Sequence, residues 1–166
     1  MNLSLESVKE TLQKLEEYLT ALTKGTNKAV KEATELMYKK IIEKCEEGNL
    51  SEFTDAIHYD FDPKTNVGRV WTKSDGKGGH GFIIIINEFG SGIKGTANGY
   101  ANKHGYEINM SGKGESGWAF PTKDGEFKWT HGIRSKQMFY EAFEEVKRQY
   151  GKIVEMSLDG EIGKLY

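Results

Sequence analysis

The sequence predicts an α+β fold in which helices pack on one side of a mainly antiparallel sheet, with N-terminal helices and a long insertion before the last long helix. Apolar residues recur at intervals of three or four near both ends of the chain, as in amphipathic helices. They alternate with polar residues between positions 53 and 73, as in half-buried strands. Fifteen of the 20 glycines lie from Gly68 to Gly132, so the middle of the chain is rich in turns.

Length and composition fit one soluble domain with extensions, since the chain has 166 residues, 37% of them hydrophobic, and a mean hydropathy of −0.62. No apolar run approaches the roughly 20 residues that span a bilayer, and the N-terminus lacks a signal-peptide layout, so we expect a protein made and kept in a cytoplasm. The net charge of −2 disfavours nucleic acid as a tightly held ligand. The lone Cys45 lies at helical spacing from Ile41 and is expected to be a buried structural thiol.

Two helices are predicted before the first strand. The first starts at a cap formed by Ser4 or Ser7, and Gly25 is expected to end it. It carries one apolar stripe with an unbroken three-four spacing, made of Leu5, Val8, Leu12, Leu15, Leu19 and Leu22. The second helix is expected from Asn27 to Gly48. The stripe either packs on this second helix or forms a coiled-coil seam with a neighbouring subunit.

The elements that follow are expected to build the sheet and close the domain. Residues 53–61 and 67–73 predict a hairpin around the turn at 62–66. The apolar run 82–86 predicts a central strand, with a short buried helix as the alternative, because periodicity cannot separate the two in so brief a run. Ser135 is expected to cap a helix that ends at Gly151. Residues 153–158 then predict a closing strand.

The insertion 90–132 is much longer than an ordinary connection of about 4–6 residues, and loops of that length are usually functional or disordered. Disordered segments are poor in aromatic residues. This one carries six, Tyr100, Tyr106, Trp118, Phe120, Phe127 and Trp129. Such large side chains gain free energy when they are covered. We therefore expect another protein chain to cover part of the insertion.

No catalytic residue, cofactor or metal site is predicted. The four histidines, His58, His80, His104 and His131, are scattered and show none of the paired spacings of zinc ligands. Carboxylates such as Glu88, Asp124 and Glu126 do not identify an acid–base pair, because sequence separation says nothing of their distance. The glycine-rich runs also lack the spacings of phosphate-binding loops.

Four motifs resemble one protein family. The turn Glu88-Phe89-Gly90-Ser91-Gly92 lies within INEFGSG, and it is followed by GYANKHGYEINMSGKGESGWAF, KWTHGI and QMFYEAF. In this order they resemble the neck and tail-completion proteins of tailed bacteriophages, over roughly residues 26–158. Ser91 stands where that family usually has threonine, His131 where it has lysine and Met138 where it has proline.

The resemblance implies a non-catalytic virion protein that forms a ring and helps to join the DNA-filled head to the tail. Its partners would be other copies of itself, the head-closure or connector protein, and the tail-tube or tail-terminator protein, while DNA passes through the lumen without specific binding. Residues 90–132 would be an arm laid over a neighbour. The interface is expected to include Glu88, Phe89, Gly90, Gly92, Tyr100, Tyr106, Trp118, Phe120, Trp129 and Phe139.

The implied organisation is a helical extension at 1–25, a single domain at 26–158 that includes the arm, and a tail at 159–166. The implied location is the virion, with assembly in the host cytoplasm. Two other functions remain open. A carbohydrate- or peptidoglycan-binding module would use Tyr100, Tyr106, Trp118 and Trp129 as a stacking surface on the free monomer. A small hydrolase would need two titratable groups close together in the folded site.

Overall fold

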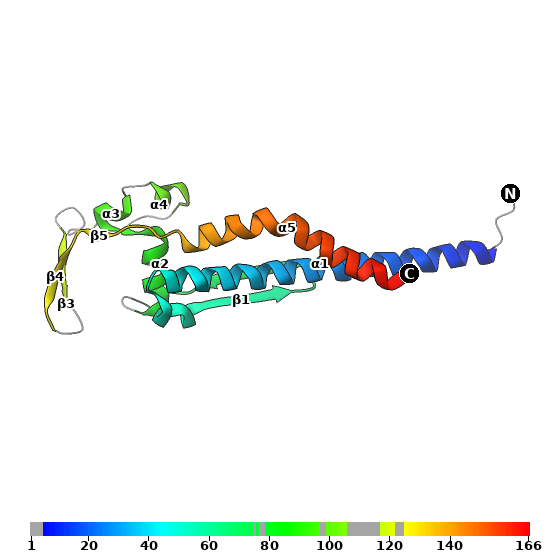
Figure 1. Ribbon diagram of the computed structural model, residues 1–166, viewed down its shortest axis with the longest axis horizontal. Helices are drawn as coiled ribbons and strands as arrows, with labels where there is room; N and C mark the ends of the chain where they lie inside the picture. The colour runs from blue at the N-terminus through cyan, green and yellow to red at the C-terminus, as the bar shows by residue number, and fades with distance from the viewer. Residues whose placement is uncertain (1–4, 75, 77–78, 97–98, 106–116, 122–124) are drawn as a thin grey trace. The chain divides into compact units, whose positions relative to one another are not determined.

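The computed structural model confirms an α+β fold, with helices predominating over short strands (Figure 1). It describes residues 5–74, 76, 79–96, 99–105, 117–121 and 125–166. The helices are α1 (Leu5–Glu47), α2 (His80–Phe89), α3 (Gly92–Thr96), α4 (Tyr100–Lys103) and α5 (Met138–Ile162), with 3-10 turns at Ser51–Ala56 and Gly163–Leu165. The strands are β1 (Ile57–Asp62), β2 (Val67–Thr72), β3 (Trp118–Pro121), β4 (Phe127–Thr130) and β5 (Gly132–Ile133).

Within the described residues, the named strands form two separate two-stranded sheets, β1 with β2 and β3 with β4. The first is the predicted hairpin, whose first strand begins at Ile57, after a 3-10 turn, and not at Phe53. Its turn is held by Asp62, whose carboxylate accepts hydrogen bonds from the backbone N–H of Lys64 at 2.9 Å and the hydroxyl of Thr65 at 2.8 Å. These bonds lower the pKa of Asp62, the hydroxyl bond contributing most.

The two predicted N-terminal helices are one continuous helix, so the expected break at Gly25 is wrong. Gly25 is buried, and a Cβ at this position would lie 2.8 Å from Cδ2 of Leu158. Glycine is therefore present because α1 approaches another helix closely. Asn27 is not an N-cap either, because its side-chain amide donates to the carbonyl of Pro63 at 3.2 Å. The end near Gly48 is confirmed.

The last helix, α5, also continues through its expected end at Gly151 to Ile162, so the closing strand predicted at 153–158 is wrong. Ile153, Val154 and Ser157 are buried or half-buried at intervals of one and three residues, which a helix places on one face. In a strand, Ile153, Glu155 and Ser157 would point to the same face. Glu155 and Met156 are exposed, so neither face of such a strand would be evenly buried.

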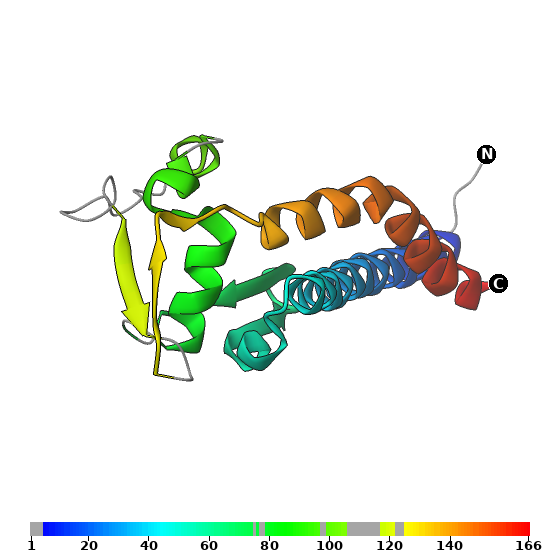
Figure 2. The ribbon, with the colours of Figure 1, turned by 60° about the vertical axis from the view of Figure 1, so that its left-hand side comes forward.

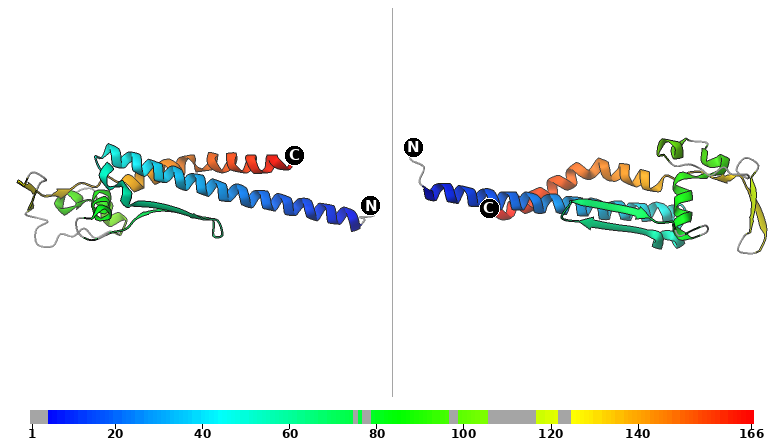
Figure 3. Two further views of the ribbon diagram at one scale, coloured as in Figure 1. Left: turned by 90° about the horizontal axis from the view of Figure 1, so that it is seen from below. Right: turned by 180° about the vertical axis from the view of Figure 1, so that it is seen from behind.

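The chain divides into two compact units, to which α1 and α5 both contribute. Unit 1 comprises 1–39, 59–70 and 143–166, with its described part starting at Leu5. Helix α1 packs closely on α5 at Gly25 and on β2 at Gly68, where a Cβ would lie 1.7 Å from the hydroxyl oxygen of Thr34. In Figure 3, the N-terminal turns of α1 extend beyond the last turns of α5.

Unit 2 comprises 40–58 and 71–142. The apolar run 82–86 lies in α2, so the strand expectation is wrong and the alternative of a short buried helix is confirmed (Figure 2). Its buried positions are Gly81, Ile84, Asn87 and Glu88, at helical spacing. The residues buried in this unit include Ile41, Cys45, Leu50, Ile57, Ile84, Ala101, Met138 and Ala142.

Cys45 belongs to this core, as expected, and lies 3.6 Å from the sulfur of Met138. Burial raises the pKa of its thiol to about 11. Among the described helices, none is both long enough and apolar enough to cross a membrane.

Candidate functional site

A buried glutamate joins α2 to α5 within unit 2. Glu88 is 5% exposed, and its carboxylate accepts hydrogen bonds from the backbone N–H groups of Phe139 at 2.9 Å and Tyr140 at 3.3 Å. These groups belong to the first turn of α5, where backbone N–H groups lack partners inside the helix and a negative charge is favourable. Glu88 therefore caps α5 across 51 residues of sequence.

The expected cap, Ser135, has a different partner. Its hydroxyl donates to the backbone carbonyl of Glu88 at 2.8 Å. The backbone N–H of Lys136 donates to the carbonyl of Asn87 at 2.7 Å. The segment that leads into α5 is thus tied to the last turn of α2 by main-chain and side-chain bonds together.

Tyr100 completes this junction from α4. Its hydroxyl donates to Oε1 of Glu88 at 2.5 Å, and its side chain is buried. Burial, followed by the bond to Glu88, raises the pKa of Tyr100 well above its usual value, so the phenol stays protonated and remains a donor. The ring of Tyr100 stacks on Phe89 with centroids 5.8 Å apart and meets Tyr140 edge-on at 5.7 Å.

The glycines of the Glu88–Gly92 turn allow two backbone segments to approach closely. Gly92 pairs with Gly132, and Ser91 pairs with Ile133, in antiparallel bridges. Gly132 has φ of 109°, and a Cβ there would lie 1.9 Å from the carbonyl oxygen of Ser91. The Ser91 hydroxyl accepts a bond from the N–H of Ile133 at 3.2 Å, a role that threonine could also fill. The turn thus fixes the chain where it leaves β4.

Strands β3 and β4 form a hairpin (Figure 2). Within the described residues, the large exposed aromatic side chains of the insertion lie on β4. Trp129 lies opposite Ala119, and Phe127 lies opposite Pro121. Because side chains alternate between the faces of a strand, Phe127 and Trp129 share one face. They are 73% and 63% exposed, respectively. We call this face, made of Phe127 and Trp129, the aromatic face.

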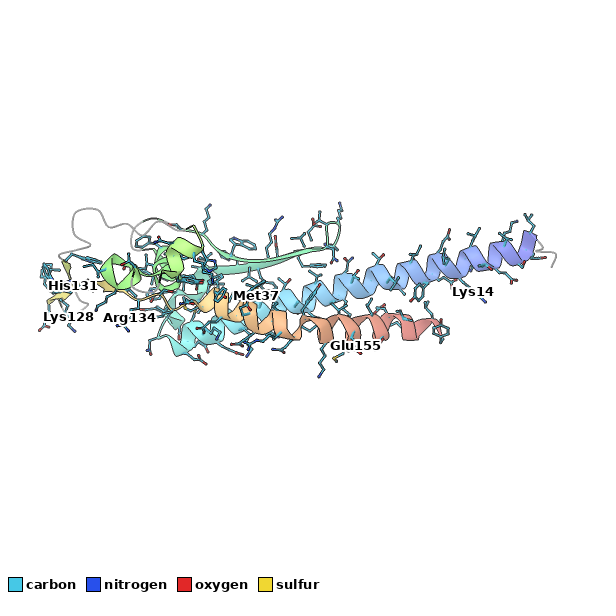
Figure 4. All side chains as sticks on the ribbon, turned by 90° about the horizontal axis from the view of Figure 1, so that it is seen from above. Lys14, Met37, Lys128, His131, Arg134 and Glu155 are labelled. Carbon is cyan, nitrogen blue, oxygen red and sulfur yellow. The ribbon has the colours of Figure 1, made fainter. Side chains whose placement is uncertain are left out.

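Basic side chains lie near the aromatic face. Figure 4 labels Lys128, His131 and Arg134 at the end of unit 2 that holds β4 and β5, and all three are exposed. Lys128 alternates with Phe127 and Trp129 along β4 and so points to the opposite face of the hairpin. A partner that covers the aromatic face at this end of unit 2 would meet both apolar rings without contacting Lys128, and Arg134 would supply positive charge nearby.

The ten predicted interface residues therefore separate into two groups. Glu88, Gly90, Gly92 and Tyr100 are buried and bind other parts of the same unit, and Phe89 and Phe139 are half-buried beside them. On the hairpin, Trp129 is exposed and Trp118 is half-buried. Tyr106 lies outside the described residues, and for Phe120 the description covers the backbone, which pairs with Lys128.

Sequence reasoning placed Phe127 in the insertion but not in the interface, and it missed a groove in unit 1. This groove has a volume of about 340 Å³. Its lining is almost entirely apolar and comes from α1, β2 and α5: Val30, Ala33, Thr34, Met37, Gly68, Val70, Phe143, Val146, Lys147 and Tyr150. The signal for it in the sequence is the helical spacing of Val30, Ala33 and Met37.

No cluster of three or more metal-ligating side chains occurs in the part of the chain that the structure describes. Among the described histidines, His80 lies beside a carboxylate, with its Nδ1 atom 2.7 Å from Oδ1 of Asp55. Both side chains are substantially exposed, at 47% and 70%. This geometry is that of a hydrogen-bonded pair at the surface.

Neither the protein-family models nor the curated proteins nor the solved structures compared with this chain gave a match. The functional interpretation therefore depends on the sequence motifs and on the two exposed apolar features, the aromatic face and the groove.

Proposed function

We propose that this chain is a structural protein of the neck of a tailed bacteriophage, where a ring of its copies helps to join the DNA-filled head to the tail. The observation that carries the proposal is the aromatic face. Phe127 and Trp129 stand on a two-stranded hairpin, and such a hairpin alone is at best marginally stable in water. Covering it with a neighbouring chain would bury both rings and stabilise the hairpin.

The Glu88 junction supports this function from the inside of unit 2. An arm that binds a neighbour needs a rigid base, because motion at the base increases the entropy lost on binding. The turn at Gly90–Gly92 and its pairing with Gly132 supply that base, next to β4. The family resemblance of the same turn is thus consistent with a structural role that supports the arm.

A ring requires two different patches on each subunit, so that each copy binds the next in a head-to-tail manner and the rotation closes. The hairpin would provide one patch, and its outer strand edges would also allow strand addition by a neighbour. The overall charge of −2 suits a lumen through which DNA slides without being held. In this proposal the protein acts without catalysis, cofactor or metal.

The test uses a phage whose genome encodes this chain. Deleting the gene should leave DNA-filled heads and free tails that fail to join, and the wild-type gene supplied in trans should restore joined particles. A double variant, Phe127→Ala with Trp129→Ala, should fail to restore them. Lys128→Ala is the matched control, because it changes the opposite face of the same strand, and it should restore joining. Joined particles in the deletion strain would refute the proposal.

The alternative, a carbohydrate- or peptidoglycan-binding module, would use the same exposed rings for stacking on sugars. Binding of the purified chain to peptidoglycan, lost in the Phe127→Ala, Trp129→Ala variant, would favour it. Filter binding to duplex DNA at low salt tests the conduit role separately, and submicromolar affinity would argue against a passive lumen.

A further inference from the structure

The apolar stripe on the N-terminal part of α1 is exposed in unit 1. Leu5, Val8, Leu12, Leu15 and Leu19 are between 41% and 76% exposed. The end of α5 and the 3-10 turn after it face a different side of α1, where Glu161 and Leu165 line one pocket with Gln13, Glu17 and Thr20. The packing of the stripe on a second helix of the same chain, one of the two expectations from the sequence, is therefore wrong for these five residues.

The stripe and the groove lie on the same face of one helix. From Leu22 the spacing continues through Thr26, Val30, Ala33 and Met37 in steps of three or four residues. Such steps keep side chains on one helical face. The first half of this face is the exposed stripe, and Val30, Ala33 and Met37 form part of the groove lining. Unit 1 thus carries two apolar surfaces, one convex and one hollow.

The two surfaces match in size and chemistry. If each carbon atom takes about the 30 Å³ of a water molecule, a groove of about 340 Å³ holds roughly two or three leucine side chains. Leucines three and four residues apart on one helix project together, so successive stripe residues can enter the groove as a set. Recognition of this type, in which an amphipathic helix lies in an apolar groove, recurs in protein complexes.

Charge also favours this pairing. The segment from Leu5 to Leu22 contains four glutamates and two lysines, an excess of two negative charges. The charged residue that lines the groove is Lys147, whose ammonium group lies 5.8 Å from the ring centre of Phe143 and 3.3 Å from Oε1 of Glu144. Because Glu144 offsets part of the lysine charge, the attraction between the negatively charged helix and the groove is small.

We propose that the stripe of one copy of this chain binds in the groove of a second copy. The contact joins two non-identical surfaces of unit 1 and is separate from the hairpin. It does not depend on the virion role, since it would hold together an oligomer of any function. The occupant follows from the chain itself, which presents both the exposed apolar helix and an apolar groove of fitting size.

Sedimentation equilibrium of the full chain is the first test. We expect the fraction of oligomer to rise with protein concentration. The double variant Leu12→Asp, Leu15→Asp should lower the association constant at least about a hundredfold, because burying one leucine contributes roughly ten- to a hundredfold in affinity. Lys14→Asp is the control on another side of the same helical turns (Figure 4) and should retain association. Because these leucines are exposed, circular dichroism of the double variant should match that of the wild type. A strictly monomeric chain would overturn the proposal.

Crosslinking identifies the surfaces. In a Cys45→Ala background, which removes the one native cysteine, one preparation carries Leu12→Cys and the other Val30→Cys. We expect a short bismaleimide to join the two preparations when they are mixed, and to do so much less when Lys14→Cys replaces Leu12→Cys. If the stripe bound the stripe of a second copy and not its groove, Leu12→Cys and Leu15→Cys preparations would crosslink with each other and not with Val30→Cys. That result would refute the proposed contact. Crosslinking between Leu12→Cys and Val30→Cys copies, together with absence of the chain from the phage neck, would leave this contact standing and refute only the proposed function.

Discussion

Replacing Glu88 with alanine should destabilise the protein far more than an ordinary surface change. The substitution removes the carboxylate that caps α5 through Phe139 and Tyr140, and caps contribute about 0.5–2 kcal/mol. It also removes the charged acceptor of the buried Tyr100 hydroxyl, and hydrogen bonds to charged groups contribute about 1.5–3 kcal/mol. Together we expect the free energy of unfolding to fall by about 2–4 kcal/mol, since such contributions are not fully additive.

Urea unfolding followed by far-ultraviolet circular dichroism measures this loss. With a slope of about 1–3 kcal/mol per molar urea, the midpoint should fall by at least about 0.7 M. The control is Glu141→Ala, which removes an exposed carboxylate from the first turn of the same helix together with its 3.1 Å ion pair to Lys44. That change should cost no more than about 1 kcal/mol.

A double-mutant cycle isolates the bond between the two buried side chains. Tyr100→Phe removes the donor and keeps the ring, and Glu88→Ala removes the acceptor. Residues in one hydrogen-bond network have coupling energies of about 0.5–3 kcal/mol, and we expect about 1–2 kcal/mol here. If Glu88→Ala is no more destabilising than Glu141→Ala, or if the two changes are additive, the junction does not hold α5 in the way described.

Three further changes test the fold. Gly25→Ala should destabilise the protein by about 1–3 kcal/mol, because its Cβ would meet Leu158. Gly151→Ala should stabilise it by up to about 1 kcal/mol, because Gly151 lies in an open helical site. Urea unfolding measures both changes, and equal effects would contradict the close approach of α1 to α5 at Gly25. Gly132→Ala should cost at least about 2 kcal/mol in the same assay, because its Cβ would clash with a backbone carbonyl at positive φ, and an unchanged midpoint would contradict the pairing. Cys45 should react with iodoacetamide at pH 8 at least about a hundredfold more slowly in the native protein than in denaturant, because it is buried and its pKa is raised to about 11, and equal rates would contradict this burial.

Local patterns in the sequence identified much of the fold. The three-four spacing of apolar residues indicated both long helices, and the alternation with its Asp62 turn indicated the first hairpin. Two glycines were mistaken for helix ends, for different physical reasons. Gly25 allows a close helix–helix approach, and Gly151 lies in open space on a helix whose remaining residues favour continuation. Neither property is visible in a single sequence.

The candidate site was less predictable, because its bonds cross long stretches of sequence. The Glu88–Gly92 turn was selected from its glycines, but the cap that Glu88 provides depends on Phe139, 51 residues later. Ser135 had the composition of a cap and instead bonds to the backbone of Glu88. The exposure of Phe127 and Trp129 depends on the register of β3 and β4, and alternation alone does not say which face is covered.

The most direct test of the proposed neck function is electron cryomicroscopy of intact phage particles that contain this protein. The proposal predicts a ring of this chain between the head and the tail, with Phe127 and Trp129 of each copy buried against a neighbouring chain. Absence of the chain from the neck, or a neck ring in which both side chains face solvent, would contradict it.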